Sequence, residues 1–333
     1  MKEINKNSFD IVSLVAAVDV MLAHTIANAG GGRKLLFWRF LAPGPAVAVM
    51  FAVSGFLVTA SYERSSKTLD FYKKRIMRIY PPLIAAVVIP VILYLCFGLL
   101  PFKPVQILVE CVKTICIGSF GKYTVPVGAV GNGSLWTIVI QMQFYFLTPL
   151  LFRLLKNRRI AVVLFVAMLS VNLLSLRIEG ILTGTVERLY SLTCLPYLYM
   201  YLFGMIIYIY REKLLEKLQN SLVPLLVCYA LIHWVFALDL RFTWKYINPV
   251  SALLIMSIAI GAAFRFGNHR MKWDVSYGIY LWHLPVFDFV HIILGIDYSA
   301  GLLLLTWCIT FIVAILVNQL MNKLMKRDLP DSE

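Results

Sequence analysis

Charged residues are scarce in this sequence, and acidic residues are the scarcer sign. Charged residues make up 14% of the 333 residues and hydrophobic residues 60%, whereas a soluble domain carries about a quarter charged residues. The chain has 31 Lys and Arg against 17 Asp and Glu, a formal net charge of +14. The basic residues form short clusters between apolar runs, with no single patch or tail, which argues against nucleic-acid binding. The composition indicates a protein that has lipid as its solvent.

The sequence also lacks metal-ligand spacing, internal repeats and low-complexity segments. The six cysteines mostly fall inside apolar stretches, so we interpret them as small buried side chains. The five histidines do not cluster either, and no metal is expected. The first apolar run, 9–28, is too long for the h-region of a signal peptide and contains Asp19 and His24. We therefore expect this run to be a membrane span and not a cleaved signal.

Long apolar runs account for most of the chain. A helix needs about 20 apolar residues to cross the hydrocarbon core, and the runs predict an all-α, polytopic membrane protein with about ten transmembrane helices. The predicted spans are 9–28, 43–62, 79–100, 135–155, 160–177, 191–210, 221–239, 249–265, 274–294 and 299–322. The stretch 104–119 is short and carries Glu110 and Lys113, so we interpret it as an interfacial or re-entrant helix. We expect one membrane domain over residues 1–333.

Lys and Arg are distributed unevenly between the connections. With both termini cytoplasmic, the inside segments hold 21 of the 31 basic residues and the outside segments hold 10. The clusters at 73–78, 156–159 and 323–327 then all fall inside, as the positive-inside rule requires. Counting 104–119 as a further span would move the second cluster outside. The charge pattern therefore predicts that both termini are cytoplasmic.

The first predicted span carries polar groups on one face. At about 100° per residue, Asp10, Ser13, Ala17 and His24 lie within about 60° of one another. Ser13 and His24 are roughly 16 Å apart along the helix axis. Ionisable groups inside a span are costly and are functional candidates by default. We expect this stripe to carry an acid near the cytoplasmic end and an imidazole toward the outside.

Short sequence blocks follow one another in order between residues 9 and 286. They are Phe9-Asp10 with His24, Phe51 to Leu57 with Ser54-Gly55-Phe56, Phe71 to Pro82 with Arg75, Arg78 and Tyr80, Leu135-Trp136-Thr137 with Phe144-Tyr145, Leu195-Pro196-Tyr197 with Phe203-Gly204, and Ser276 to Pro285 with His283. In this order the blocks resemble the acyltransferase-3 family of integral membrane acyltransferases. Two positions depart from the family pattern, with Ser13 in place of an arginine and Gln141 in place of a glutamate.

The resemblance implies an O-acyltransferase of the surface-polysaccharide type. Such an enzyme takes acetyl from cytoplasmic acetyl-CoA and places it on a hydroxyl of an extracytoplasmic glycan or lipid-linked sugar, in a bacterial inner (plasma) membrane. A base at the sugar hydroxyl accelerates this transfer by about 10²–10⁴-fold, and His24 is the best candidate because neutral imidazole accepts a proton. Asp10 and Ser13 share its helix face and complete the expected catalytic set. The outer loops 120–134 and 178–190 are expected to select the acceptor.

The remaining candidates divide between donor and acceptor. We expect Arg75 and Arg78 to grip the phosphates of acetyl-CoA, with Ser54 and Tyr80 nearby, although the arginines equally obey the positive-inside rule. The expected acceptor-site residues are Trp136, Gln141, Tyr145 and His283. For Trp136 and Tyr145 the alternative is packing or interfacial anchoring, and for His283 it is a hydrogen-bonded core histidine.

Two other function classes fit parts of the sequence. In a transporter or flippase, Asp19, His24 and His283 would form an ion or proton pathway, although no paired repeat supports that class. A sensor or scaffold derived from the enzyme would explain Ser13 and Gln141.

Overall fold

The chain is helical throughout the part that the structure describes. A computed structural model describes residues 7–29, 44–178, 181, 183–232, 248–267, 271, 274–297 and 299–328. No strand occurs within these ranges, which confirms the all-α prediction. A helix satisfies its backbone N–H and C=O groups internally, and this is what an apolar chain in lipid requires.

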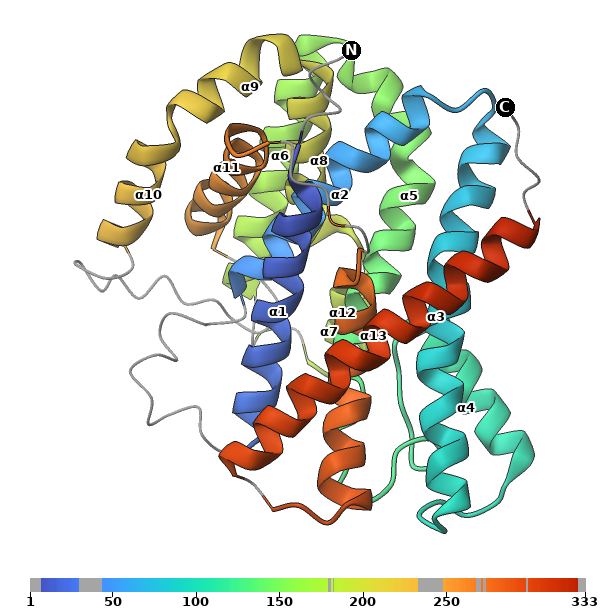
Figure 1. Ribbon diagram of the computed structural model, residues 1–333. Helices are drawn as coiled ribbons and strands as arrows, with labels where there is room; N and C mark the ends of the chain where they lie inside the picture. Colours follow the sequence, from blue (N-terminus) through green and yellow to red (C-terminus); the bar gives the residue numbers. More distant parts are fainter. Residues whose placement is uncertain are drawn as a thin grey trace. The chain divides into compact units, whose positions relative to one another are not determined.

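The described residues contain thirteen α-helices and a few short segments of other helix types (Figure 1). The α-helices are α1 (Phe9–Asn28), α2 (Gly44–Glu63), α3 (Thr68–Cys96), α4 (Pro104–Ile117), α5 (Trp136–Leu155), α6 (Arg158–Ile178), α7 (Gly184–Ser191), α8 (Leu198–Ile209), α9 (Arg211–Asn220), α10 (Leu222–Ala230), α11 (Pro249–Arg265), α12 (Ser276–Asp288) and α13 (Ala300–Asp328). Two 3₁₀ turns, η2 (Gly133–Leu135) and η3 (Leu195–Tyr197), precede α5 and α8. A π-helical segment, η5 (Phe289–Ile293), continues α12.

Six helices of the described chain are long and apolar enough to cross a membrane. They are Phe9–Asn28, Ala46–Glu63, Thr68–Cys96, Gly133–Leu155, Arg158–Ser175 and Ala300–Leu320. Each of them overlaps a predicted span. The predicted spans 191–210 and 249–265 correspond to shorter apolar helices, 274–294 to α12 and η5, and 221–239 begins as α10 and continues outside the described residues. The count of ten spans and the orientation of the termini stay predictions.

Helices α3 and α4 differ from simple membrane spans. Helix α3 begins at Thr68, eleven residues before the predicted span, so the segment Phe71–Pro82 is helical. It continues through Pro81, Pro82 and Pro90, which a membrane helix tolerates when neighbouring groups satisfy the freed carbonyls. Helix α4 has 14 residues, too few for a span at 1.5 Å per residue. This agrees with a short helix in place of an eleventh span.

The helices form two compact units. The first unit comprises the described residues within Met1–Ala16, Gly44–Lys73 and Ile140–Met271. Helices α2 and α8 pack together in it through Gly55 and Gly204. A Cβ atom on Gly55 would overlap the carbonyl oxygen of Tyr201, and one on Gly204 would overlap that of Ala52. The absence of side chains at these two glycines is what allows the backbones to approach so closely.

The second unit comprises the described residues within Ala17–Pro43, Lys74–Val139 and Lys272–Glu333. Helices α12 and α13 contact one another in this unit, drawn orange and red in Figure 1. The C-terminal half of α1 is tied to α13, because Trp307 Nε1 donates to Thr25 Oγ1 at 2.9 Å. This unit therefore places the residue next to His24 against a long apolar helix.

Candidate functional site

His24 and His283 form a hydrogen-bonded pair in the second unit. His24 Nδ1 lies 3.0 Å from His283 Nε2, and the two rings are stacked with 5.2 Å between their centroids. His283 is fully buried, whereas His24 is partly exposed. The other nitrogen of His283, Nδ1, lies 3.1 Å from the carbonyl oxygen of Ile279 one turn earlier on α12. The structure thus brings together two residues that are 259 positions apart in the sequence.

The segment before α5 holds the part of α12 that carries His283. Pro285 has no N–H, so the carbonyl of Leu281 lacks its usual partner within the helix. The side-chain amide of Asn132 donates to this carbonyl at 2.8 Å. On the same helix, the Tyr280 hydroxyl donates to the Ser134 carbonyl at 2.7 Å. These bonds satisfy buried polar groups and fix α12 in the turn just before His283.

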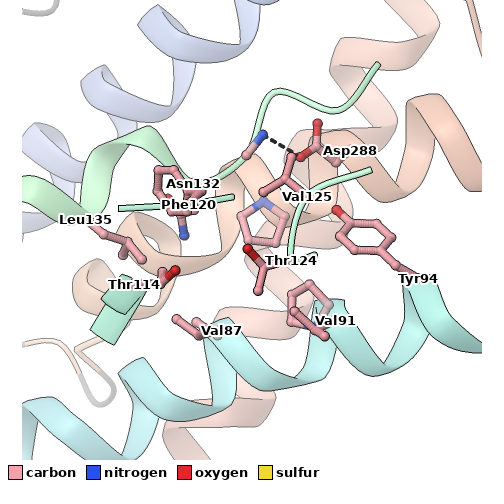
Figure 2. A pocket seen from close by; sticks show the side chains of 14 residues that line it. Val87, Val91, Tyr94, Thr114, Phe120, Thr124, Val125, Asn132, Leu135 and Asp288 are labelled. Carbon is pink, nitrogen blue, oxygen red and sulfur yellow. Dashed lines mark hydrogen bonds between the residues drawn. The ribbon is translucent and has the colours of Figure 1, made fainter. Parts of the chain in front are cut away.

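Asp288, the last residue of α12, anchors the loop that precedes α5 (Figure 2). Its two carboxyl oxygens accept the backbone N–H groups of Val130 and Gly131 at 2.7 and 3.0 Å, and Tyr94 also bonds to it. Gly131 has φ 71°, a left-handed conformation that glycine adopts without strain. Asp288 is 1% exposed, and the small pocket beside it encloses about 40 Å³. This volume suits a water molecule and is too small for a sugar.

A second carboxyl group holds the other end of the same loop. Glu110 on α4 accepts the backbone N–H of Tyr123 at 2.8 Å and the Thr124 hydroxyl at 3.3 Å. Burial, with a smaller contribution from Glu110, raises the pKa of the adjacent Cys111 thiol. A thiol with a raised pKa is a poor nucleophile at neutral pH. The loop expected to select an acceptor is therefore fixed at two points by carboxyl groups.

The first unit contains a polar cluster formed by Ser54, Gln141 and Tyr145. Gln141 Nε2 donates to Ser54 Oγ at 3.1 Å and to Tyr145 Oη at 2.6 Å. Ser54 and Tyr145 are buried, and Gln141 is partly exposed. The sequence had divided these residues between donor and acceptor, whereas the fold places all three together on α2 and α5.

The basic candidates lie on α3. Arg78 forms an ion pair with Asp274, with 3.5 Å between Arg78 Nη2 and Asp274 Oδ2, and their side chains are 60% and 35% exposed. Arg75 and Tyr80 are partly exposed on the same helix. Tyr277, on the last sequence block, donates from its hydroxyl to the carbonyl of Ile79 at 3.1 Å. Helix α3 and the start of α12 are thus joined beside the arginines.

The remaining predicted site residues are Asp10, Ser13 and Trp136. Asp10 and Ser13 occupy the first turns of α1, and His24 lies near its end. Trp136 is the first residue of α5 and is partly exposed. His233 and His269 lie outside the described residues. Among the residues that are described, no three His, Cys, Asp or Glu side chains gather as a metal site.

Sequence reasoning missed the residues that support α12. Asp274, Asp288 and Asn132 were not singled out. Asp274 pairs with Arg78, Asn132 bonds to α12 two residues before His283, and Asp288 holds the backbone at 130–131. One signal was present, because Asp288 is an acidic residue inside an apolar run. Asn132 gave no such signal, since a polar residue in a predicted loop is ordinary.

Comparisons with known proteins agree with the sequence blocks. The family model for the acyltransferase domain, acyltransferase-3, matches residues 6–322. Nodulation protein 10 of Rhizobium leguminosarum bv. viciae is 28% identical over 307 residues, which cover 85% of this chain and 83% of that protein. The O-acetyl transferase of Shigella phage Sf6 is 26% identical over 336 residues, covering 97% of both chains. No solved structure matches this chain.

A third relative is longer than this chain. The O-acetyltransferase OatA of Staphylococcus aureus (strain NCTC 8325 / PS 47) is 27% identical over 284 residues. The match covers 74% of this chain but 46% of OatA. The similarity therefore concerns one part of that protein.

Proposed function

This chain belongs to the acyltransferase-3 family, and from that premise we propose that it transfers acetyl from cytoplasmic acetyl-CoA to a hydroxyl of a surface glycan or its lipid-linked precursor. Its relatives include proteins named as O-acetyltransferases, and its apolar helices make it a multi-pass membrane protein. Two of the matched relatives are bacterial and one belongs to a phage of bacteria, which favours a bacterial inner membrane and an acceptor in the cell envelope.

The observation that carries the proposal is the imidazole pair of His24 and His283. O-acylation requires a group that removes the proton of a poorly nucleophilic hydroxyl. His24 is partly exposed and lies on a candidate span, so it meets that need within the apolar bundle. As the hydroxyl oxygen bonds to the thioester carbonyl carbon, His24 takes the hydroxyl proton. The carbon–sulfur bond then breaks, and the proton passes to the departing thiolate.

The other clusters are assigned to substrate binding. Ser54, Gln141 and Tyr145 present hydroxyl and amide groups of the kind that hydrogen-bond a sugar or an acyl carbonyl. Trp136 offers a stacking surface for a sugar ring. Arg75, Arg78 and Tyr80 are assigned to the donor, because a planar guanidinium binds phosphate oxygens in pairs. Asp10 and Ser13, at the start of α1, belong to the same proposed cytoplasmic side.

Replacement of the proposed base provides the test. Purified protein in proteoliposomes would be given radiolabelled acetyl-CoA, with a panel of methyl hexosides as acceptors and water as the alternative acceptor. We expect His24→Ala to lower acetyl transfer by about 10²-fold or more, within the range for general-base loss. His291→Ala is the matched control, since it removes an imidazole whose Nδ1 contacts the Ile296 carbonyl at 3.0 Å, five residues along the chain.

Two outcomes would count against the proposal. Transfer by His24→Ala within about threefold of the unaltered protein would remove His24 as the base, because a base contributes far more than this. If the unaltered protein neither hydrolyses acetyl-CoA nor transfers its acetyl group, the transporter or sensor alternatives would take precedence.

A further inference from the structure

We infer that His283 is a positioning residue, which sets the nitrogen of His24 that acts as the base. The catalytic role of His283 rests on the proposed function, in which His24 is the base. The tautomer of His24 follows from the hydrogen bonds alone. His283 was expected to bind substrate. However, both of its ring nitrogens are within hydrogen-bond distance of protein atoms, and the ring is fully buried.

The direction of each hydrogen bond follows from the carbonyl of Ile279. A carbonyl oxygen only accepts, so the proton in the 3.1 Å contact must be on His283 Nδ1. Neutral imidazole carries one N–H, which leaves His283 Nε2 as an acceptor. The donor in the 3.0 Å contact is then His24 Nδ1. The lone pair of His24 is consequently on Nε2, the nitrogen that does not face His283.

The neutral form of both rings is favoured by their surroundings. Within the described residues, no carboxylate lies within ion-pair distance of either histidine. A buried imidazolium without such a partner is costly. A protonated His283 would instead donate to His24 Nδ1 and force the remaining proton of a neutral His24 onto Nε2, where it would block base catalysis.

Both helices that carry the pair are held by neighbouring bonds. On α12, the Asn132 amide satisfies the Leu281 carbonyl, two residues before His283. On α1, Thr25 Oγ1 accepts from Trp307 and donates to the Met21 carbonyl, and the Asn28 amide donates to the carbonyl of His24 itself at 2.7 Å. The 3.0 Å contact between His24 Nδ1 and His283 Nε2 is therefore supported by bonds on both helices. A hydrogen-bond partner at one nitrogen is what selects the tautomer of a histidine.

The tautomer can be measured directly, because the chain contains only five histidines. Protein labelled with ¹⁵N-histidine would be reconstituted in liposomes and studied by solid-state NMR, with signals assigned by single His→Gln variants. We expect His24 to carry its proton on Nδ1 and to be unprotonated at Nε2. His291, which faces the Ile296 carbonyl through Nδ1, is an internal reference for the same tautomer. A His24 protonated at Nε2 in the unaltered protein would overturn the inference, and the variants serve only to assign the signals.

Two substitutions of His283 separate positioning from packing. His283→Gln keeps an oxygen that can accept from His24 Nδ1, whereas His283→Leu keeps volume without an acceptor. We expect the Nδ1–H signal of His24 to disappear in His283→Leu. The kcat of His283→Leu should be at least tenfold lower than that of His283→Gln, with the KM for acetyl-CoA unchanged in both. Equal activity of the two variants, or an unchanged His24 signal in His283→Leu, would refute the positioning role.

The two proposals fail in different ways. If His24→Ala retains acetyl transfer, the base assignment fails even when the NMR tautomer is as expected. If His24→Ala abolishes transfer but His24 is protonated at Nε2, the proposed function stands and the role of His283 is refuted.

Discussion

Arg78 has a competitor for any phosphate that it binds, namely the carboxylate of Asp274. The two side chains are 60% and 35% exposed, and an ion pair that water reaches stabilises a protein by about 1 kcal/mol or less. Separation of the two groups therefore costs little. If Arg78 binds the phosphates of CoA, Asp274 opposes that binding by holding the guanidinium and by repelling the anion.

Removal of the Asp274 carboxylate should therefore strengthen the binding of CoA. We expect Asp274→Asn to raise the affinity for CoA by about two- to fivefold, the equivalent of up to about 1 kcal/mol. Asn retains an oxygen that can accept the N–H of Ser276, now 3.2 Å from Asp274 Oδ1, so the start of α12 is preserved. Isothermal titration of detergent-solubilised protein with CoA at low salt measures the change.

The control for this substitution is Asp70→Asn, which removes one negative charge from α3 at a carboxylate that contacts Ser66 at 3.1 Å. A gain in affinity equal to that of the control would show a general charge effect. A loss of affinity in Asp274→Asn would contradict the role of Arg78 in donor binding.

At the residue scale, the sequence identified candidate functional side chains better than it identified the residues that they contact. His24 and His283 were each recognisable as ionisable groups in apolar runs. Their contact was not, because it joins positions 259 apart and depends on how α12 packs. Ser54 and Gln141 were divided between two sites for the same reason. Helical periodicity predicts which residues share a face of one helix, but it carries no information on which face of another helix lies opposite.

At the scale of elements, α12 depends on a loop that is distant in sequence. Pro285 breaks the backbone ladder, and η5 follows directly after Asp288. Each irregularity is met by the segment 130–134, through Asn132 and through the N–H groups bound by Asp288. The apolar run 274–294 predicted a helix here correctly. The π-helical end could not be predicted, because hydrophobic periodicity carries no information on tertiary bonds such as those of Asp288.

Substitution of Asp288 tests how far the loop relies on α12. Asp288→Asn keeps the shape but replaces one of the two acceptor oxygens with a donor. We expect a loss of about 1–3 kcal/mol of stability, the cost of leaving a buried N–H without its partner. In hydrogen–deuterium exchange, a peptide covering 118–132 should exchange faster. Asp297→Asn is the control, because Asp297 is exposed. Unchanged exchange in this peptide would show that the loop is held by other contacts, chiefly those of Glu110.

At the scale of the whole molecule, three helices contribute to both compact units. The unit boundaries at 16–17, 73–74 and 139–140 fall within α1, α3 and α5. Two of these helices carry proposed site residues in both units, with Asp10 and His24 on α1 and Trp136 and Gln141 on α5. The continuous chain therefore links the clusters covalently. The sequence predicted these three helices only as separate apolar runs, because hydrophobic periodicity and composition do not reveal which helices pack into the same unit.

The direction of the chain across the membrane can be tested at a single helix. Between Lys122 and Lys156 the chain contains one candidate span, Gly133–Leu155. If this helix crosses the bilayer, the two lysines lie on opposite sides, whatever the remaining helices do. The excess of basic residues in the predicted inside segments, 21 of 31, then predicts that Lys156 is the cytoplasmic one.

Cysteine labelling distinguishes the two sides. In a variant whose six native cysteines are replaced, Lys122→Cys should react with a membrane-impermeant maleimide in intact cells, and Lys156→Cys should react only after the membrane is permeabilised. Reaction of both positions in intact cells would show that Gly133–Leu155 does not cross. Reaction of Lys156→Cys alone would invert the orientation and place the arginines of α3 on the side without acetyl-CoA. The donor assignment of Arg75 and Arg78 would then be wrong, because phosphates of a cytoplasmic donor could not reach them.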